Sequence, residues 1–593
     1  MCINCKLMAA LAEGAASSMG ETGMVGSASR AGGRTGPTGS VSASDGLATV
    51  VFRRGAVYTL DPLSPWAEAV AVRDRHIVAV GSNADVSALI GPGTRIVELD
   101  GRMLLPGFVE AHIHPIVGAF FTPGVDLQLP SRHDALAAVS AYARDNPSGP
   151  IRGFGWRVDM FPPEGPSRND LDRIVPDRPA LLFSIDAHSA WVNSKSLEIA
   201  GVTRDTPDPV PGFSFYQRDP AGEPTGYVLE LPAVLGIVGA IEPVTKAAMT
   251  TLLADWAPKA AAAGITAVFD AGMPPEGNDP AGLATVYTDL ERQGRLPFRV
   301  VVSHIVKAPP IDDAVSQTVA LRQRFATELV RGGVLKIIGD GTAEGYTAYL
   351  LAPYADKPDS IGQSPFSEDD WRRLIVDADI ADIDVHVHAI GDRTVRIALD
   401  AIEAAIKANP PRERRHSIAH LVYVDDTDVP RFGELGVIAQ FSGNWMSADP
   451  STVDIALERY GPQRQQQFFR ARAVLDTGAT VAFGTDWPAA GYFSTYKPLD
   501  AVQIAVTRQL IGRPDAPILA PADQRLDLAQ ALHAATLGAA RQLRLDDVVG
   551  SVQAGKLADL VVLRRNLFDV SASDIASTPV DMTMMNGTFT HGA

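Results

Sequence analysis

Leu104–Pro115 has the sequence Leu-Leu-Pro-Gly-Phe-Val-Glu-Ala-His-Ile-His-Pro, an apolar run that ends in two histidines one residue apart. On an extended strand residues i and i+2 point to the same face, so the imidazoles of His112 and His114 are expected to lie side by side. Pro115 cannot donate to a strand ladder and ends the strand. Two neutral imidazoles there form half of a site for a metal ion such as zinc. The alternative, one histidine in the core and one in a turn, is less consistent with this context.

The chain is long and acidic. Its 593 residues are 46% hydrophobic, enough for a large core, and its formal net charge is −17. This charge argues against nonspecific binding to nucleic acid or anionic membranes. Apolar runs fall short of the roughly 20 residues that cross a bilayer, and the N-terminus is a poor secretory signal. We therefore expect a cytoplasmic enzyme with a small-molecule substrate, no nucleic-acid or membrane partner, and a homo-oligomeric state, a dimer.

Residues 1–45 are rich in Gly, Ser, Ala and Thr and have no apolar period, so we predict a disordered tail. The only two cysteines, Cys2 and Cys5, lie in this tail. Two cysteines are too few for a disulfide framework or for a zinc site of four thiolates. Their spacing also fits a redox or metal pair, but their place in the tail favours incidental thiols.

The two ends of the chain are β-rich and the middle is not. Short alternating apolar runs occur between residues 48 and 99 and again between 550 and 590. We predict one β-sandwich domain assembled from residues 46–103 and 545–593. Between them, apolar strand-like runs alternate with amphipathic helical stretches, a pattern typical of a parallel α/β fold.

Eight such runs predict a (β/α)8 TIM barrel, residues 104–124 and 246–544. They are Leu104–His114, Ala267–Asp270, Arg299–His304, Val334–Ile338, Ile383–His388, His416–His420, Val437–Gln440 and Val481–Asp486. About 150 residues separate the first two runs, far more than a barrel loop needs. Residues 125–245 are therefore predicted to be an inserted subdomain, a candidate lid over the active site, because insertions after barrel strands lie at the C-terminal face.

Several of the predicted strands end in a residue that can bind a metal ion. These residues are Lys336, His388, His420 and Asp486, in addition to the first histidine pair. Strand ends converge on one pocket in a barrel, so distant residues can meet there. His386 is expected to pack or to support a ligand, because the turn at Gly391 leaves His388 nearer the strand mouth. His416 is expected at the wrong strand end. Asp486 is a metal ligand or a proton acceptor.

Taken together, these motifs resemble those of the amidohydrolase superfamily of metal-dependent hydrolases, in the amidohydrolase family 3 branch that holds N-substituted formamide deformylase. The resemblance covers residues 48–590. It rests on Pro106-Gly107-Phe108, His112-Ile113-His114, Lys336, Asp340-Gly341, His388 to Asp392, His420, Gly484-Thr485-Asp486, Gly550-Ser551, Gly555 to Val561, and His188 with Trp191 to Ser194.

The resemblance implies a role for each residue at the site. His112 and His114 would hold the more buried of one or two Zn²⁺ ions, and His388 and His420 would hold the second. Lys336 would carry a carbamate that bridges the ions, and Asp486 would bind the first ion and act as the general base. The branch usually has Glu before the ligand histidine, whereas this chain has Ala419 before His420. A carboxylate that orients this ligand is therefore expected to be missing.

Substrate contacts are predicted from aromatic and polar residues of the insert and the strand ends. They are Trp156, His188, Trp191, Asn193, Tyr346, Trp445 and Trp487. The alternative is that the tryptophans pack the insert on the barrel. His188 ranks first as a polar contact to substrate or oxyanion and as a second catalytic residue.

The resulting hypothesis is a metal-dependent hydrolase that cleaves the C–N bond of a small, moderately hydrophobic amide, such as an N-substituted formamide. Two alternatives stay open. One is a hydrolase of C–O bonds in esters or lactones on the same scaffold. The other is a non-catalytic relative that keeps the fold for binding.

Overall fold

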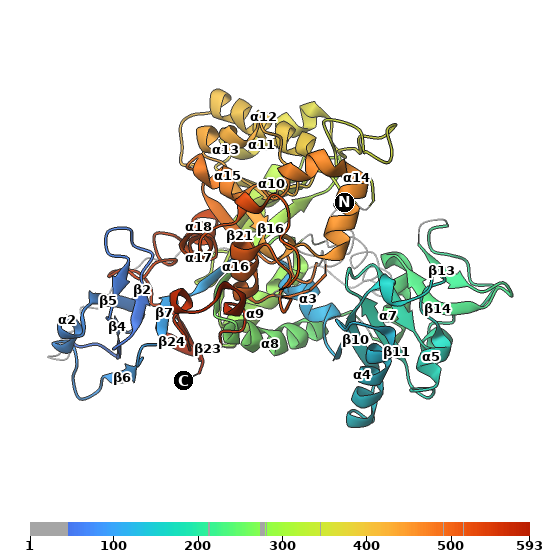
Figure 1. Cartoon of the computed structure of the whole chain (residues 1–593), viewed down its shortest axis with the longest axis horizontal. Helices are drawn as coiled ribbons and strands as arrows, with labels where there is room; N and C mark the ends of the chain where they lie inside the picture. Colours follow the sequence, from blue (N-terminus) through green and yellow to red (C-terminus); the bar gives the residue numbers. More distant parts are fainter. Residues whose placement is uncertain are drawn as a thin grey trace, which may run out of the picture.

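A computed structural model of the chain describes residues 46–211, 214–242, 244–272, 279, 281–343, 345–489, 492–513 and 515–592. The predicted disordered tail, with Cys2 and Cys5, lies outside these residues. In the described part a central barrel has the two-ended β domain on one side and the insert on the other (Figure 1).

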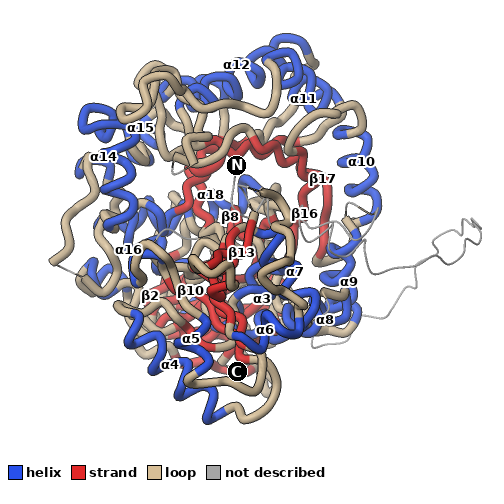
Figure 2. The backbone as a smooth tube through the Cα atoms, turned by 90° about the vertical axis from the view of Figure 1, so that its right-hand side faces the viewer, coloured by secondary structure: helices blue, strands red, loops and turns tan. Residues whose placement is uncertain are grey.

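Eight parallel strands form the central barrel and confirm the predicted α/β class. In sheet order they are β21 (Val481–Gly484), β20 (Ile438–Ser442), β19 (Ser417–His420), β18 (Asp384–Ala389), β17 (Val330–Ile338), β16 (Arg299–Val306), β15 (Ile265–Asp270) and β8 (Phe108–Ile113). The ring closes between its last and first strands, where the Asp486 amide donates to the His112 carbonyl at 2.8 Å. Figure 2 shows the strands as a ring surrounded by helices.

The barrel strands are apolar because they are buried on both sides, and the covering helices are amphipathic. In α12 (Asp392–Ala408), for example, Val395, Ala398, Leu399 and Ile402 are buried at helical spacing. The other helices of the barrel region are α3 (Pro115–Phe121), α8 (Lys246–Ala262), α9 (Thr285–Arg292), α10 (Ala314–Arg324), α11 (Glu368–Ile380), α13 (Val429–Leu435), α14 (Pro450–Arg464), α15 (Ala471–Asp476), α16 (Pro498–Thr507), α17 (Leu528–Ala534) and α18 (Leu537–Gln542).

The predicted first strand, Leu104–His114, is in fact two strands in two sheets. β7 (Met103–Pro106) pairs with β2 (Ala56–Tyr58) and β22 (Leu560–Leu563) of the β domain, and β8 begins after Gly107. A Cβ at Gly107 would lie 2.3 Å from the Thr266 side chain, so glycine allows the close approach at this crossing. The predicted barrel boundary at residue 104 is therefore corrected to Phe108.

Strands from both ends of the chain form the β domain, and Figure 1 shows the blue strands beside the red β23 and β24. One sheet contains β5 (His76–Gly81), β4 (Ala69–Arg73), β1 (Val50–Arg53) and β6 (Arg95–Glu98). The other contains β24 (Thr588–His591), β23 (Val580–Met585), β22 (Leu560–Leu563), β7, β2 (Ala56–Tyr58) and β3 (Trp66–Ala67). Side chains of both sheets, such as Phe52, Val70, Leu104 and Val562, share one apolar cluster.

The insert after α3 has its own sheet and core. The sheet order is β13 (Phe215–Arg218), β14 (Pro224–Leu229), β12 (Ser189–Val192), β11 (Ala180–Ser184), β10 (Ile151–Trp156) and β9 (Val125–Asp126). Its helices are α4 (Arg132–Asp145), α5 (Arg168–Asp172), α6 (Ser194–Ile199) and α7 (Leu231–Ile241). In the described chain no single helix is long and apolar enough to span a membrane; α7 and α8, bent by 97°, reach that length and composition only as a pair.

Candidate metal centre

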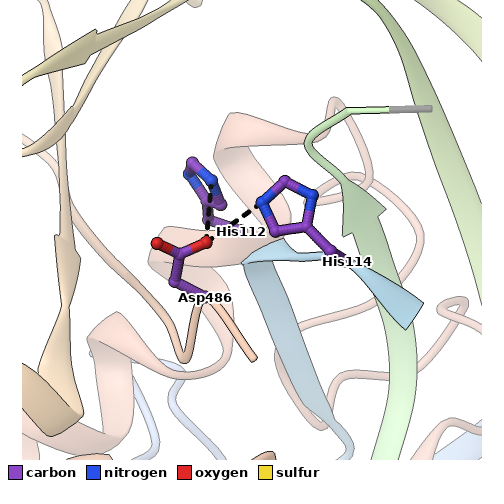
Figure 3. Close-up of side chains that lie close together, drawn as sticks. All are labelled: His112, His114 and Asp486. Atoms are coloured by element: carbon purple, nitrogen blue, oxygen red, sulfur yellow. Dashed lines mark ion pairs between the residues drawn. The ribbon is translucent and has the colours of Figure 1, made fainter. Parts of the chain in front are cut away.

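His112 in β8, His114 directly after that strand and Asp486 after β21 converge inside the barrel. Nε2 of His114 lies 3.1 Å and Nε2 of His112 lies 3.4 Å from Oδ1 of Asp486. One potential ligand atom of each residue lies within 4.8 Å of the others, and all three side chains are fully buried. Figure 3 shows both rings turned toward the carboxylate. The two imidazoles lie near each other as predicted, with ring centroids 5.4 Å apart, although the strand ends at Ile113 and His114 is the N-cap of α3.

His420, His388 and Lys336 lie beside this group. The ring centroid of His420 is 4.7 Å from that of His112 and 4.5 Å from that of His388, and its Nδ1 is 3.7 Å from Oδ2 of Asp486. Lys336 is fully buried on β17, and its charge acts on the imidazoles of His112 and His420. The structure thus brings together all six residues predicted to bind metal.

The donor atoms fit a divalent cation. Burial first, and then the charges of Lys336 and neighbouring histidines, hold the pKa of His112 well below its usual range, and burial does the same for His420. Neutral imidazoles keep the lone pair that a metal ion needs. Nε2 of His112, Nε2 of His420 and the Asp486 oxygens are buried and have no hydrogen-bond partner among the described residues. A cation would satisfy these acceptors.

The backbone is unusual at two of these residues. His420 has φ 74° and Asp486 has φ 57°, in the left-handed region that residues with a Cβ rarely adopt. Such strain costs roughly 1 to 3 kcal/mol and gathers at functional sites. Here it turns each side chain at its strand end into the barrel.

Neighbouring side chains orient the ligands. Nδ1 of His420 lies 3.0 Å from the Ser442 hydroxyl, so a serine of β20 orients this ring where the expected carboxylate is absent. His386, expected to pack or to support a ligand, lies with Nε2 2.8 Å from Nδ1 of His112. His416 bonds to Asp379 at 3.2 Å, away from the centre.

Two buried carboxylates were missed by sequence reasoning. Oε2 of Glu110 accepts from the Thr485 amide at 2.8 Å and from its hydroxyl at 2.9 Å, and burial raises the Glu110 pKa to about 8. Glu110 precedes His112 by two positions, so the same alternation that gave the histidine pair could have found it. Asp270 accepts from the Tyr287 hydroxyl at 2.6 Å, and burial raises its pKa to about 6.

The residues predicted to contact substrate lie in different environments in the structure. Trp445 stacks on His420 with centroids 5.1 Å apart and an interplanar angle of 10°. Trp487, next to Asp486, is buried and stacks on Trp256 at 5.0 Å, so its ring packs the barrel rim. Tyr346 donates its hydroxyl to Asp356 at 2.8 Å, and Arg459 covers its ring.

Three predicted contacts of the insert lie inside its core instead. Trp156 and Trp191 are fully buried and donate their indole N–H groups to the carbonyls of Leu182 and Ser167. Asn193 caps α6, and its amide donates to the carbonyls of Val175 and Arg178. These side chains hold the insert together, so the expectation of pocket-lining residues is corrected. His188 bonds through Nδ1 to Glu230 at 2.8 Å.

Comparisons with known proteins agree with this architecture. The profile of the Amidohydrolase family matches residues 95–591. The putative amidohydrolase YtcJ of Bacillus subtilis is 29% identical over 91% of this chain and 98% of its own length. N-substituted formamide deformylase of Arthrobacter pascens is 26% identical over 90% of this chain and 96% of its own, and the protein LONG AFTER FAR-RED 3 of Arabidopsis thaliana is 29% identical over 90% of each chain.

Solved structures share the fold. An uncharacterized metal-dependent hydrolase from Pyrococcus horikoshii OT3 superposes with a TM-score of 0.68 at 23% identity and covers 88% of this chain and 99% of its own. A second, from Pyrococcus furiosus, has a TM-score of 0.66 at 23% identity and covers 87% and 99%.

Proposed function

Because this chain belongs to the amidohydrolase family, we propose that it is a metal-dependent hydrolase that cleaves the C–N bond of a small, moderately hydrophobic amide. The observation that carries this proposal is the buried convergence of His112, His114 and Asp486 at one end of the barrel. The likeness to N-substituted formamide deformylase supports an amide, and a formamide in particular, as the substrate class.

His112, His114 and Asp486 would hold one ion, with zinc favoured by two imidazoles and one carboxylate. His388 and His420 would hold a second, and Lys336, carboxylated on its amine, would lie between them. When bound, the cation supplies the Lewis acidity that polarises a carbonyl and lowers the pKa of water. The carboxylate of Asp486 would accept a proton from the attacking water, and this role is supported by its buried oxygens, which have no hydrogen-bond partner among the described residues. The same carboxyl group then returns that proton to the leaving nitrogen.

The first test is Asp486→Asn. Because the amide cannot accept a proton as a carboxylate does, we expect turnover to fall by about 10²- to 10⁴-fold while the fold and much of the metal are retained. Turnover of N-phenylformamide and the metal-to-protein ratio are measured together. Asp476→Asn, at an exposed helix end paired with Arg472, is the matched control and should behave like the unaltered protein.

Three results would contradict parts of this proposal. A near-normal kcat in Asp486→Asn would show that Asp486 is not the general base. A thoroughly chelated protein that still hydrolyses N-phenylformamide at the full rate would show that the reaction does not need a metal ion. Faster hydrolysis of phenyl formate than of N-phenylformamide, after correction for their intrinsic reactivity, would move the activity to C–O bonds.

A further inference from the structure

Two insert residues 42 positions apart form a carboxylate–imidazole pair. His188 follows β11 and Glu230 precedes α7, and Nδ1 of His188 lies 2.8 Å from Oε2 of Glu230. Both side chains are mostly buried, with 15% and 26% of their surface exposed. Neither residue takes part in the candidate metal centre described above.

The backbone around this pair is held in uncommon conformations. Ala187 has φ 59°, and Glu230 has φ 63° with ψ 154°. The His188 amide donates to Asp186 at 2.9 Å, and the Ser184 hydroxyl bonds to the same aspartate. Residues with a Cβ keep such conformations only where the surroundings impose them, and these positions concentrate at functional sites.

The second ring nitrogen of His188 lacks a hydrogen-bond partner among the described residues. Nε2 is buried and has no hydrogen-bond partner in the part of the chain that the structure describes. An ionised Glu230 can only accept, so it selects the tautomer with the proton on Nδ1. In that tautomer Nε2 carries a lone pair, and it needs a donor from outside the fold.

Residues next to the pair belong to an apolar cluster that extends from the insert to the C-terminal end of β8. Ala187 and Leu231, the chain neighbours of His188 and Glu230, share an apolar cluster with Ile113 and Ile116. Ile113 is the last residue of β8 and Ile116 lies in the first turn of α3, on either side of His114 in the sequence. Viewed from the side of the insert, α7 lies in front of the ring of barrel strands (Figure 2).

We propose that Nε2 of His188 accepts a hydrogen bond from the N–H of the scissile amide, and that Glu230 is the positioning residue that fixes the accepting tautomer. This inference rests on the proposed amide hydrolysis and narrows it to primary and secondary amides. A tertiary amide or an ester has no N–H at this position, so it leaves the buried acceptor unpaired. Sites built around such a hydrogen bond reject analogues that lack it.

The test compares N-phenylformamide with N-methyl-N-phenylformamide as the ratio of their kcat/KM values. Glu230→Leu removes the acceptor, and we expect this ratio to fall by about tenfold or more relative to the unaltered protein. Glu230→Gln keeps a carbonyl oxygen that can accept from Nδ1, so it should retain most of the preference. Glu223→Leu, at an insert glutamate paired with Arg204, should leave the ratio unchanged.

A second measurement does not depend on turnover. ¹³C and ¹⁵N NMR of labelled histidine, assigned with His188→Gln, distinguishes the Nδ1–H tautomer from the Nε2–H tautomer. We expect Nδ1–H in the unaltered protein and a shift toward Nε2–H in Glu230→Leu, with the metal content unchanged in both.

The outcomes separate the two proposals. An unchanged kcat/KM ratio in Glu230→Leu, or Nε2–H in the unaltered protein, would overturn the role of the pair while amide hydrolysis stands. If the unaltered protein turns over neither formamide, the proposed function fails for this substrate class, and the tautomer still decides whether Glu230 sets the His188 ring.

Discussion

The lone pair of His112 is directed by a chain of hydrogen bonds that runs back into the barrel wall. Nδ1 of His386 lies 2.7 Å from the Ser417 hydroxyl, which itself donates to the Val385 carbonyl. Ser417 then accepts from Nδ1–H of His386, so Nε2 of His386 must accept from Nδ1–H of His112. Nε2 of His112 is left as the acceptor that faces Asp486. Metal-binding histidines are commonly oriented through their other ring nitrogen in this way.

His386→Leu tests this chain of hydrogen bonds. Without a partner on Nδ1, the His112 ring loses its fixed tautomer, so we expect metal affinity to fall by about 10- to 100-fold. Competition with a chelator gives the affinity, and the melting temperature of the metal-free protein reports any loss of packing. Ser417→Ala should show a smaller effect in the same direction. Equal affinity in His386→Leu and the unaltered protein would refute the orienting role.

At the level of single residues, the sequence predicted which side chains converge in the barrel better than it predicted which residues line a substrate pocket. His112, His114, His388 and His420 were identified because a barrel brings strand ends together, whatever the loops do. Trp156 and Trp191 were misjudged because an aromatic residue has the same sequence signal in a core as in a pocket. Their burial inside the insert becomes visible only once its strands are arranged in a sheet. Glu230 carried no signal, because its partner lies 42 residues away.

At the scale of secondary-structure elements, the candidate site is assembled where the barrel closes between β8 and β21. β8 contains His112 and leads into His114, and β21 leads into Asp486, so these three side chains meet only if the two strands lie side by side. Their approach is very close at Gly484, where a Cβ would lie 2.3 Å from the His112 amide nitrogen and 2.7 Å from its carbonyl oxygen. Both of these neighbours are backbone atoms and cannot rotate away.

Gly484→Ala should therefore separate the two strands slightly. We expect a loss of about 1 to 3 kcal/mol in the free energy of unfolding, as for other overpacked sites, together with weaker metal binding. Thermal denaturation with and without added zinc measures both. Gly93→Ala, where a Cβ would meet no atom within 4 Å, is the control. A Gly484→Ala protein as stable as the control would show that the closure tolerates a side chain.

The eight barrel strands could be predicted because strands buried on both faces are short apolar runs. The same property hid the boundary at Gly107. Apolar residues continue without interruption from β7 into β8, although β7 belongs to the β domain and β8 to the barrel. Hydrophobicity reports burial but does not say in which sheet a strand is buried.

At the scale of the whole molecule, the β domain is joined to the barrel by a buried ion pair. Arg299, at the start of β16, pairs with Asp559 just before β22, and it also donates to Asn586 between β23 and β24. Asp559 is 3% exposed, and burial raises its pKa, while Arg299 acts in the opposite direction. The backbone carbonyl of Asp559 accepts from the Gly107 amide at 2.9 Å, at the crossing between the two sheets.

Arg299→Met should weaken this connection strongly, because it leaves the Asp559 carboxylate buried without its cation. We expect a loss of about 3 to 5 kcal/mol in the free energy of unfolding, measured by denaturant titration. Arg299→Met combined with Asp559→Asn removes both charges and should recover part of that loss, because the penalty comes from the uncompensated charge and not from the missing contact. A double variant no more stable than the single one would place the cost in lost packing instead. The β domain would then be held to the barrel by shape, and the ion pair would contribute little.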